Sequence, residues 1–338
     1  METVESILTQ TLQNFELIII NDGSTDTTGA ILRGFTDARL RVLHNAQNTG
    51  LAYSLNRGLN TAQGKYLARI DAGDLAVPER LEKQVRFLEQ HPEVGILGSG
   101  YTWINDAGQE YGSKRNPPHD LEIRWASLFK NPFFHPTVML RRDVLSEHQL
   151  SYDPTFLAAQ DYELWTRLLQ HTHGANLDDL LLAYRQNQES ITSAHRHLQL
   201  ENHDIIALRT IQQQFPEFRI SQEQVTQLRE TFVGRLQPVQ APKRQQTVLT
   251  PLYLDLLQVF CQKYAEYPDI KALKAQETLR IALIGFRTPV FSSWWDILKR
   301  IVRLSPGTIF PLSQYIFKKH VLKRGKRFFG DFQRYHGK

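Results

Sequence analysis

The stretch Phe15–Asp26, FELIIINDGSTD, decides the fold class of this 338-residue chain. Its first half, Phe15–Ile20, is an almost continuous apolar run bounded by turn residues, which is typical of a strand buried on both faces of a sheet. Its second half, Asn21–Asp26, is a cluster of turn and helix N-cap residue types. We therefore expect a buried strand that ends in a polar turn and leads into a helix.

The same alternation of strand and helix continues along the first third of the chain. The expected strands are 40–44, 65–70 and 94–101, and the expected helices are 30–34, 51–62 and 78–90. Further on, the sequence predicts extended segments at 138–141 and 180–184 and a helix at 162–169. Repeated strand–helix units predict an α/β fold in which helices flank a mostly parallel sheet.

The texture of the sequence changes near residue 196, where long, Gln-rich helical stretches begin. The expected helices are 196–214, 221–236, 248–264 and 269–284. We divide the chain into an α/β domain (1–195), a helical region (196–290) and a basic C-terminal segment (291–338).

Composition excludes several classes of protein. A single cysteine, Cys261, rules out an intramolecular disulfide framework and a multi-cysteine zinc site. No apolar run in the sequence approaches the ~18 residues that a membrane-spanning helix needs. The net charge of +5 arises at the C-terminal end, because residues 299–338 hold eleven Lys and Arg side chains and one acid. Nucleic-acid binding by the whole chain is therefore a poor inference.

Two of the expected strands end in acidic clusters, at the sheet edge where open α/β sheets bind ligands. Asn21 and Asp22 follow the first strand, and Asp71 and Asp74 follow the third. Carboxylates in such loops can hydrogen-bond a base or ribose, or hold a hard cation against a diphosphate. On spacing alone, a role as turn and helix N-cap residues remains the alternative.

Several motifs, in this order, resemble those of glycosyltransferase family 2. They are Gln10-Thr11, Phe15–Asp26, Asn48–Gly50, Asn56–Gly58, Gly64–Asp74, Arg80–Gln84, His135–Thr137 and Gln160–Trp165. The likeness covers about residues 5–195. It implies a GT-A (Rossmann-like) fold, a nucleotide-diphosphate sugar donor, a divalent cation (Mg²⁺ or Mn²⁺) and inversion at the anomeric carbon.

The resemblance also implies roles for individual residues. Asp161 matches the position of the base that takes the proton from the acceptor hydroxyl, with a plain helix N-cap as the alternative. Asn21, Asp22 and Asp71 match positions that bind the nucleotide sugar. Asp71 and Asp74 are the expected metal ligands.

The sequence departs from the family pattern at three of these places. Gly73 stands where the commonest metal ligand is an aspartate, so we expect either Asp74 to reach the cation after a modest loop shift or Asp71 to bind it weakly with water. Gln160 replaces the first acid of the usual pair, which leaves the expected base in place. Asn21 keeps an acceptor oxygen but adds a donor, so base recognition can survive with altered preference.

A larger departure concerns the start of the domain. Family members normally have a further strand before the Gln10-Thr11 motif, whereas this chain starts inside the helix that follows that strand. We expect the strand to lie centrally in the sheet, so residues 1–195 are expected to form an N-terminally incomplete GT-A domain.

The functional hypothesis is an inverting sugar transferase that acts on a saccharide or lipid-linked acceptor in surface polysaccharide or glycolipid assembly. A non-catalytic nucleotide-sugar-binding or scaffold remnant is the alternative. Residues 299–338 interleave cationic with aromatic and aliphatic side chains, which suits an anionic membrane surface, and a solvated tail is the alternative. We therefore expect a cytoplasmic protein, peripheral at the inner face of the membrane, with no nucleic-acid partner.

Overall fold

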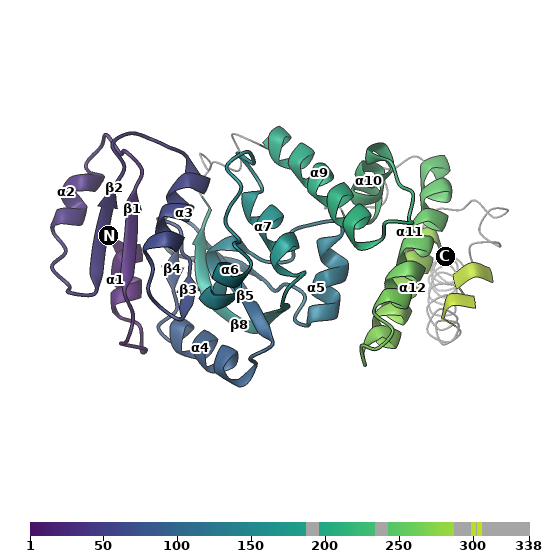
Figure 1. Cartoon of the computed structure of the whole chain (residues 1–338), viewed down its shortest axis with the longest axis horizontal. Helices are drawn as coiled ribbons and strands as arrows, with labels where there is room; N and C mark the ends of the chain where they lie inside the picture. The colour runs from purple at the N-terminus through teal and green to yellow at the C-terminus, as the bar shows by residue number, and fades with distance from the viewer. Residues whose placement is uncertain (187–195, 234–242, 287–298, 302, 306–338) are drawn as a thin grey trace, which may run out of the picture. The chain divides into compact units, whose positions relative to one another are not determined.

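The computed structural model describes residues 1–186, 196–233, 243–286, 299–301 and 303–305 (Figure 1). The chain forms two compact units, Met1–Gln214 and Phe215–Lys338. The first unit runs past residue 195 because its last helix, α9 (Arg196–Gln214), is bonded to it. The side chain of Asn202 donates to the carbonyl of Ala158 at 2.8 Å.

The first unit alternates helices and strands, as the sequence predicts. Its helices are α1 (Glu2–Leu8), α2 (Thr28–Arg33), α3 (Leu51–Thr61), α4 (Arg80–Gln90), α5 (Asp120–Ser127), the 3₁₀ helix η1 (His135–Thr137), α6 (Arg142–Glu147), α7 (Gln160–Leu168) and α9. Its strands are β1 (Leu17–Asn21), β2 (Leu40–His44), β3 (Tyr66–Ala68), β4 (Leu75–Ala76), β5 (Val94–Ile104), β6 (Glu110–Lys114), β7 (Met139–Arg141) and β8 (His173–Arg185). The strand predicted at 40–44 and the helix predicted at 196–214 are confirmed at both ends.

The strands form two sheets rather than one mostly parallel sheet. β1 and β2 make a parallel pair. The larger sheet has the order β3-β7-β5-β8-β4, with β6 paired to β5, and β5–β8 is the parallel pairing among its described strands. The sheet is mixed because β7 runs antiparallel to β3 and β5, β4 runs antiparallel to β8, and β5 returns as β6 through a tight turn. In that turn the amide of Gly108, at φ +76°, donates to the carbonyl of Asn105 at 2.9 Å.

The two sheets each leave one strand edge unpaired under helix α3. Within the described residues, β1 pairs with β2 and β3 pairs with β7, and neither has a partner on its other side. The predicted burial of β1 on both faces is wrong for this reason: Leu17–Ile20 are half-buried, whereas all but one residue of β5 are buried. α3 covers both strands, because it packs on β1 and its apolar side chains meet Leu67 of β3 in one core cluster.

The main core lies between the larger sheet and helices α3, α6 and α7. Its fully buried members include Ile96 of β5, Val138 and Leu164, with Trp165 filling the largest volume. A cavity of about 760 Å³ opens beside this core, and Leu59 of α3 and Leu67 of β3 are among its lining residues. It contains none of the residues that the sequence nominated for the site.

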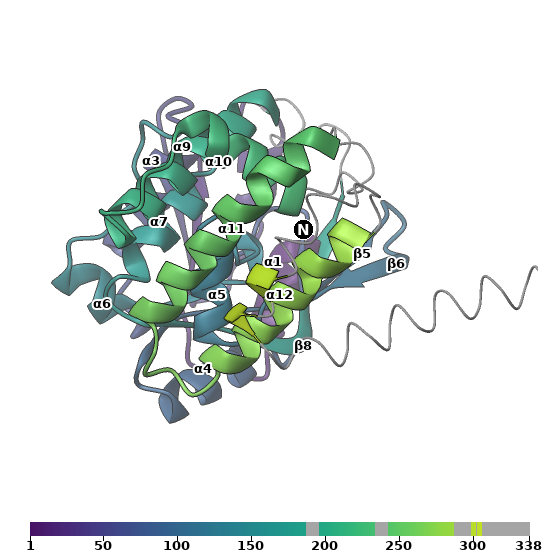
Figure 2. The ribbon, with the colours of Figure 1, turned by 90° about the vertical axis from the view of Figure 1, so that its right-hand side faces the viewer.

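The second unit is helical, as predicted. It contains α10 (Gln222–Leu228), the π-helix Arg229–Val233, α11 (Lys243–Lys263) and α12 (Ile270–Phe286). Figure 2 shows α11 and α12, which contact each other and are joined by a buried hydrogen bond of 2.7 Å from the Tyr253 hydroxyl to Glu277. Most of the basic segment predicted at 291–338 lies outside the described residues. Among the described helices, none combines the length and apolarity needed to cross a membrane.

Candidate active site

Asp161 lies partly buried in the first turn of α7, with its side chain 17% exposed. The helix begins after Ala159, whose left-handed backbone (φ +62°) turns the chain into it. The Asp161 carboxylate accepts a hydrogen bond from the Tyr162 amide at 2.8 Å and one from the Asn131 side chain at 2.7 Å. Burial raises the pKa of Asp161, while these hydrogen bonds and the charge of Arg69 oppose the rise. A desolvated carboxylate with a raised pKa is a suitable acceptor for a hydroxyl proton.

His135 and Tyr152 lie behind this carboxylate. Nε2 of His135 is 2.8 Å from the Tyr152 hydroxyl, and Nδ1 is 3.9 Å from Oδ2 of Asp161. Both side chains are buried. Burial, with the charge of Arg69, lowers the pKa of His135 well below its usual value, so the imidazole is neutral. Burial raises the pKa of the Tyr152 phenol, so the hydroxyl keeps its proton.

The loop before α7 is tied to α3 by one asparagine. The side chain of Asn56 donates to the carbonyl of Tyr152 and accepts from its amide, both at 2.8 Å. Asp153 then accepts from the amide and hydroxyl of Thr155 at 2.9 and 2.7 Å. The motif Asn56–Gly58 therefore serves to hold the segment that leads to Asp161.

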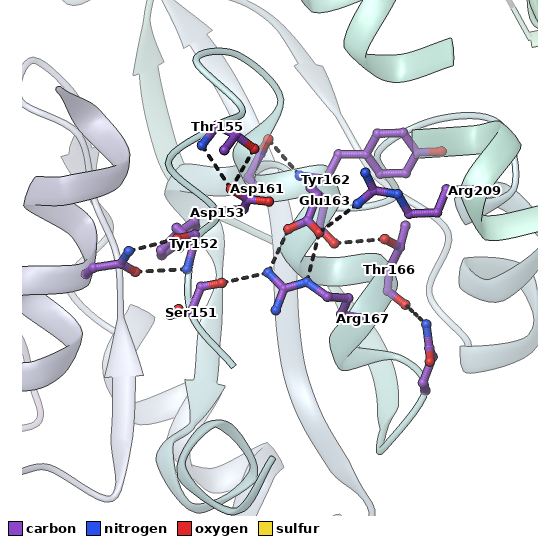
Figure 3. Close-up of polar contacts among 12 residues, drawn as sticks. Ser151, Tyr152, Asp153, Thr155, Asp161, Tyr162, Glu163, Thr166, Arg167 and Arg209 are labelled. Carbon is purple, nitrogen blue, oxygen red and sulfur yellow. Dashed lines mark hydrogen bonds and ion pairs between the residues drawn. The ribbon is translucent and has the colours of Figure 1, made fainter. Parts of the chain in front are cut away.

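Glu163, the other acid in the first turn of α7, has a structural role. Its side chain is 4% exposed and accepts from Arg167 at 2.6 and 2.9 Å (Figure 3). Arg209 of α9 lies 3.5 Å from the same carboxylate. Both oxygens of this buried carboxylate are taken up by ion pairs within the protein, so its role is to hold α7 against α9.

Arg69 and Asp71 follow β3 and lie near Asp161 and Tyr152. The Arg69 amide donates to the carbonyl of Val138 at 3.1 Å, which extends the pairing with the β7 segment. Its guanidinium group forms an ion pair with Asp71, whose side chain is 44% exposed. Nη1 of Arg69 is buried without a hydrogen-bond partner in the described part of the chain. This cationic group is thus placed to act on Asp71 and Asp161 together.

In the loop after β3, Gly73 borders open space, whereas Asp74 is buried. Gly73 has φ +102° with open space where a Cβ would be. Asp74 is 2% exposed, and its Oδ1 accepts from the Arg185 amide at 3.2 Å. Burial and the charge of Asp71 raise the pKa of Asp74 to about 7. Its carboxyl group therefore lies under the loop, so a cation at the surface would meet Asp71 first.

The residues at this place fit a divalent cation that takes one carboxylate ligand from the protein and its other ligands from a bound diphosphate and water. Among the described residues, no cluster of three or more His, Cys, Asp or Glu side chains is arranged around a metal position. Asp71 nevertheless offers an exposed carboxylate beside the open space above Gly73. Mg²⁺ commonly binds proteins through one or two carboxylates and completes its shell with phosphate oxygens and water.

Asn21 and Asp22 lie at the end of β1, in the smaller sheet. The side chain of Asn21 accepts from the Ser24 amide at 2.9 Å. The carboxylate of Asp22 accepts from Asn45, Thr49 and Gly50 at 2.7 to 3.0 Å. Asp22 therefore braces the turn between β2 and α3. Among the described residues, none of these contacts reaches Asp71, Asp74 or Asp161.

Replacing Asp22 with asparagine is expected to destabilise the protein in a pH-dependent way. Burial would raise the pKa of Asp22, but its hydrogen bonds outweigh that effect and hold the pKa at about 2, below the ordinary 3.8. A depressed pKa contributes stability above the unfolded value, and this contribution is lost as the pH falls towards the folded value. The difference in urea midpoint between wild type and variant should be full at neutral pH and vanish between about pH 4 and pH 2. A constant difference across this range would contradict the role of the charge.

The structure thus brings Asp71 and Asp161 to one centre and leaves Asn21 and Asp22 in the neighbouring sheet. Sequence reasoning missed Asn131, which donates to Asp161, Arg69, which pairs with Asp71, and Tyr152, which contacts His135. Asn131 and His135 stand close together in the segment NPFFHPT (131–137), and this pair of polar residues on either side of two phenylalanines was the available signal.

Comparison with known proteins gives a consistent result. A family model described as "Glycosyl transferase family 2" matches residues 1–149. An uncharacterized glycosyltransferase of Haemophilus influenzae is 35% identical over 210 residues, which are 59% of this chain and 65% of that relative. The O-antigen biosynthesis glycosyltransferase WbnJ of Escherichia coli is 34% identical over 193 residues, which are 56% of this chain and 74% of WbnJ.

Solved structures share the fold at low sequence identity. The crystal structure of S. aureus TarS 1-349 in complex with UDP-GlcNAc superposes with a TM-score of 0.53 at 15% identity, covering 90% of this chain and 86% of that one. The predicted GT-A fold is confirmed by this likeness. The match to the Haemophilus relative spans slightly less than two thirds of its length. These comparisons give no support to the alternative of a non-catalytic remnant.

Proposed function

The chain belongs to glycosyltransferase family 2, and we propose that it transfers a sugar from a nucleotide-diphosphate donor to a hydroxyl group of a saccharide or lipid-linked acceptor. The observation that carries this proposal is the partly buried Asp161 carboxylate, which accepts a hydrogen bond from Asn131 and lies within the field of Arg69. The acceptor hydroxyl is a weak nucleophile and needs a base at this place.

In the proposed reaction, Asp161 takes the proton of the acceptor hydroxyl as its oxygen attacks the anomeric carbon. The bond from that carbon to the diphosphate breaks, and the nucleoside diphosphate leaves with the electron pair. A single displacement from the opposite face inverts the anomeric centre. Nη1 of Arg69 is buried and has no hydrogen-bond partner among the described residues, and this guanidinium group offsets negative charge near Asp71 as the leaving group departs.

We further propose that Asn21 and Asp22 form the nucleotide-binding side, with Asp71 between nucleotide and cation. Asn21 and Asp22 are held rigidly, and a rigid side chain loses little entropy on binding. A divalent cation, when bound, would stabilise the charge of the leaving diphosphate. Asp71 would hold it, with Asp74 as a second ligand only after a movement of the loop.

The function itself is tested by a panel of UDP- and GDP-sugars with Mg²⁺ or Mn²⁺. We expect calorimetry to show binding of at least one donor, and we expect release of the matching nucleoside diphosphate when saccharide acceptors are added. Binding of no member of the panel would contradict the proposal.

Replacing Asp71 with alanine is expected to weaken cation-dependent donor binding at least about tenfold, on the scale that ligand-shell changes usually produce. Asp74→Asn, which keeps the shape of the buried side chain, should weaken it less, because Asp74 faces away from the surface. Calorimetric titration with and without a chelator makes the measurement. Equal donor affinity of the wild type in both conditions would show that binding needs no cation.

We propose a role in surface polysaccharide or glycolipid assembly, with the basic segment at an anionic membrane. The full chain should bind liposomes that contain anionic lipid, and binding should fall with added salt, since charges are screened within ~10 Å at 0.1 M. Replacing Lys323, Arg324, Lys326 and Arg327 with glutamine should weaken it. Equal binding to neutral liposomes would contradict the electrostatic mechanism.

A further inference from the structure

Two buried residues, Tyr152 and His135, form a series of polar groups with the partly exposed Asp161 at the proposed reaction centre. They come from three separate segments: the loop before α7, η1 and α7. The Tyr152 hydroxyl lies 2.8 Å from Nε2 of His135, and Nδ1 on the other side of the ring lies 3.9 Å from Oδ2 of Asp161. The imidazole also packs edge-to-face with the ring of Trp165, with ring centroids 5.7 Å apart.

A neutral imidazole carries one N–H, and the surroundings decide which nitrogen holds it. With the proton on Nδ1, the N–H points to the Asp161 carboxylate, and Nε2 accepts from the Tyr152 hydroxyl. With the proton on Nε2, the lone pair of Nδ1 would point to an anionic carboxylate, and the phenol hydrogen would lose its acceptor on the ring. The charged and titratable groups around the two rings are Arg69, Asp71 and Asp161. None of these groups favours the Nε2–H tautomer. The positive charge of Arg69 disfavours a charged imidazole but acts equally on the two neutral tautomers.

We propose that Tyr152 fixes His135 as the Nδ1–H tautomer and that His135 is thereby a positioning residue for Asp161. This inference rests on the proposed function of Asp161 as the base. At 3.9 Å the contact is electrostatic, and it adds to the hydrogen bond from Asn131 at 2.7 Å. The hydrogen bond from Asn131 and the electrostatic contact with His135 together favour the ionised, proton-accepting form of Asp161 and keep Oδ2 turned towards the protein, as oriented partners do for other bases.

The paired variants His135→Asn and His135→Gln separate the two ends of the ring. An asparagine amide can stand in for Nδ1–H, whereas the longer glutamine amide reaches the Nε2 position. We expect His135→Gln to lower kcat by about tenfold, the scale at which outer partners of a functional group act, and His135→Asn to lower it less. The donor KM should change little in either variant, because the imidazole faces the base rather than the nucleotide.

The pH profile gives a readout that a purely structural role would not move. Loss of a donor destabilises the charged form of Asp161 and raises its pKa, so the acid limb of kcat should move to higher pH in His135→Gln. It should move less in His135→Asn. The exposed His197, replaced by glutamine, serves as the control and should leave the profile unchanged. An equal loss in both His135 variants with an unmoved acid limb would overturn the positioning role.

The tautomer is measured without any turnover, by long-range ¹H–¹⁵N correlation spectra of the full chain labelled at histidine. We expect a protonated Nδ1 and an unprotonated Nε2 for His135 between about pH 5 and pH 8, assigned by the loss of these signals in His135→Asn. Tyr152→Phe should admit the second tautomer. An Nε2–H form or a cationic ring in the wild type would overturn the inference. Because this result needs no substrate, it distinguishes failure of the inference from failure of the proposed function.

Discussion

Replacing Asp161 with asparagine is expected to lower kcat at least ~10²-fold, the usual contribution of general-base catalysis. The amide has nearly the shape of the carboxyl group and can still accept from Asn131, so the packing around the first turn of α7 is preserved. It cannot take the proton of the acceptor hydroxyl. Donor affinity should change little, because the base contacts the acceptor rather than the nucleotide. Turnover and donor titration on the same preparation make the measurement.

Asp153→Asn is the matched control for this prediction. Asp153 lies in the same segment, but its carboxylate is used locally by Thr155 (Figure 3). Its replacement should leave kcat within a few-fold of the wild type. The wild-type kcat should also fall on acidification at a higher pH than an exposed aspartate would give, because burial raises the pKa of Asp161. Unaltered turnover in folded Asp161→Asn would remove Asp161 from the mechanism.

The parts of the fold that the sequence predicts best are those with a long periodic signal. α3 begins at Leu51 and α9 ends at Gln214, as expected, because amphipathic spacing and a break in the pattern mark both. β3, β4 and β7 have three, two and three residues, which are too few for alternation to be visible. The mixed direction of the larger sheet follows from these short strands and from the hairpin at Gly108, so sequence periodicity could not predict it.

The candidate site shows a similar division. Asp161 could be identified because it stands in a recognisable motif at the start of a helix. Its donor Asn131 and the Tyr152–His135 pair are brought to it by tertiary packing. Asn131 stands 30 residues before Asp161 in the sequence, and His135 stands 26 residues before it. The different exposure of Asp71 and Asp74 also depends on packing. The backbone turn at Gly73 leaves the carboxyl group of Asp71 exposed and places that of Asp74 under the loop.

An added strand at the N-terminus is expected to stabilise the first unit by several kcal/mol. The outer edges of β1 and β3 lie under the same helix, α3, and in the described part of the chain no strand pairs with their backbone N–H and C=O groups on that side. The half-buried residues of β1 and the apolar wall of the 760 Å³ cavity, which includes Leu59 and Leu67, offer apolar surface to cover. Each Å² removed from water contributes about 25 cal/mol.

The experiment extends the full chain upstream of Met1 by a flexible linker and a segment of about six β-branched and aliphatic residues. For a unit of this size, each kcal/mol corresponds to roughly 2–4 °C, so the melting temperature should rise by at least about 5 °C, and nucleotide-sugar binding should tighten. The control is the same extension with prolines at alternate positions, which cannot donate to a strand ladder and should leave the melting temperature unchanged. If both extensions behave alike, the edges of β1 and β3 do not form one strand-sized gap. In that case the split between the two sheets would be a stable feature of the fold, and Asn21 and Asp22 would have to reach the donor from the smaller sheet as it stands.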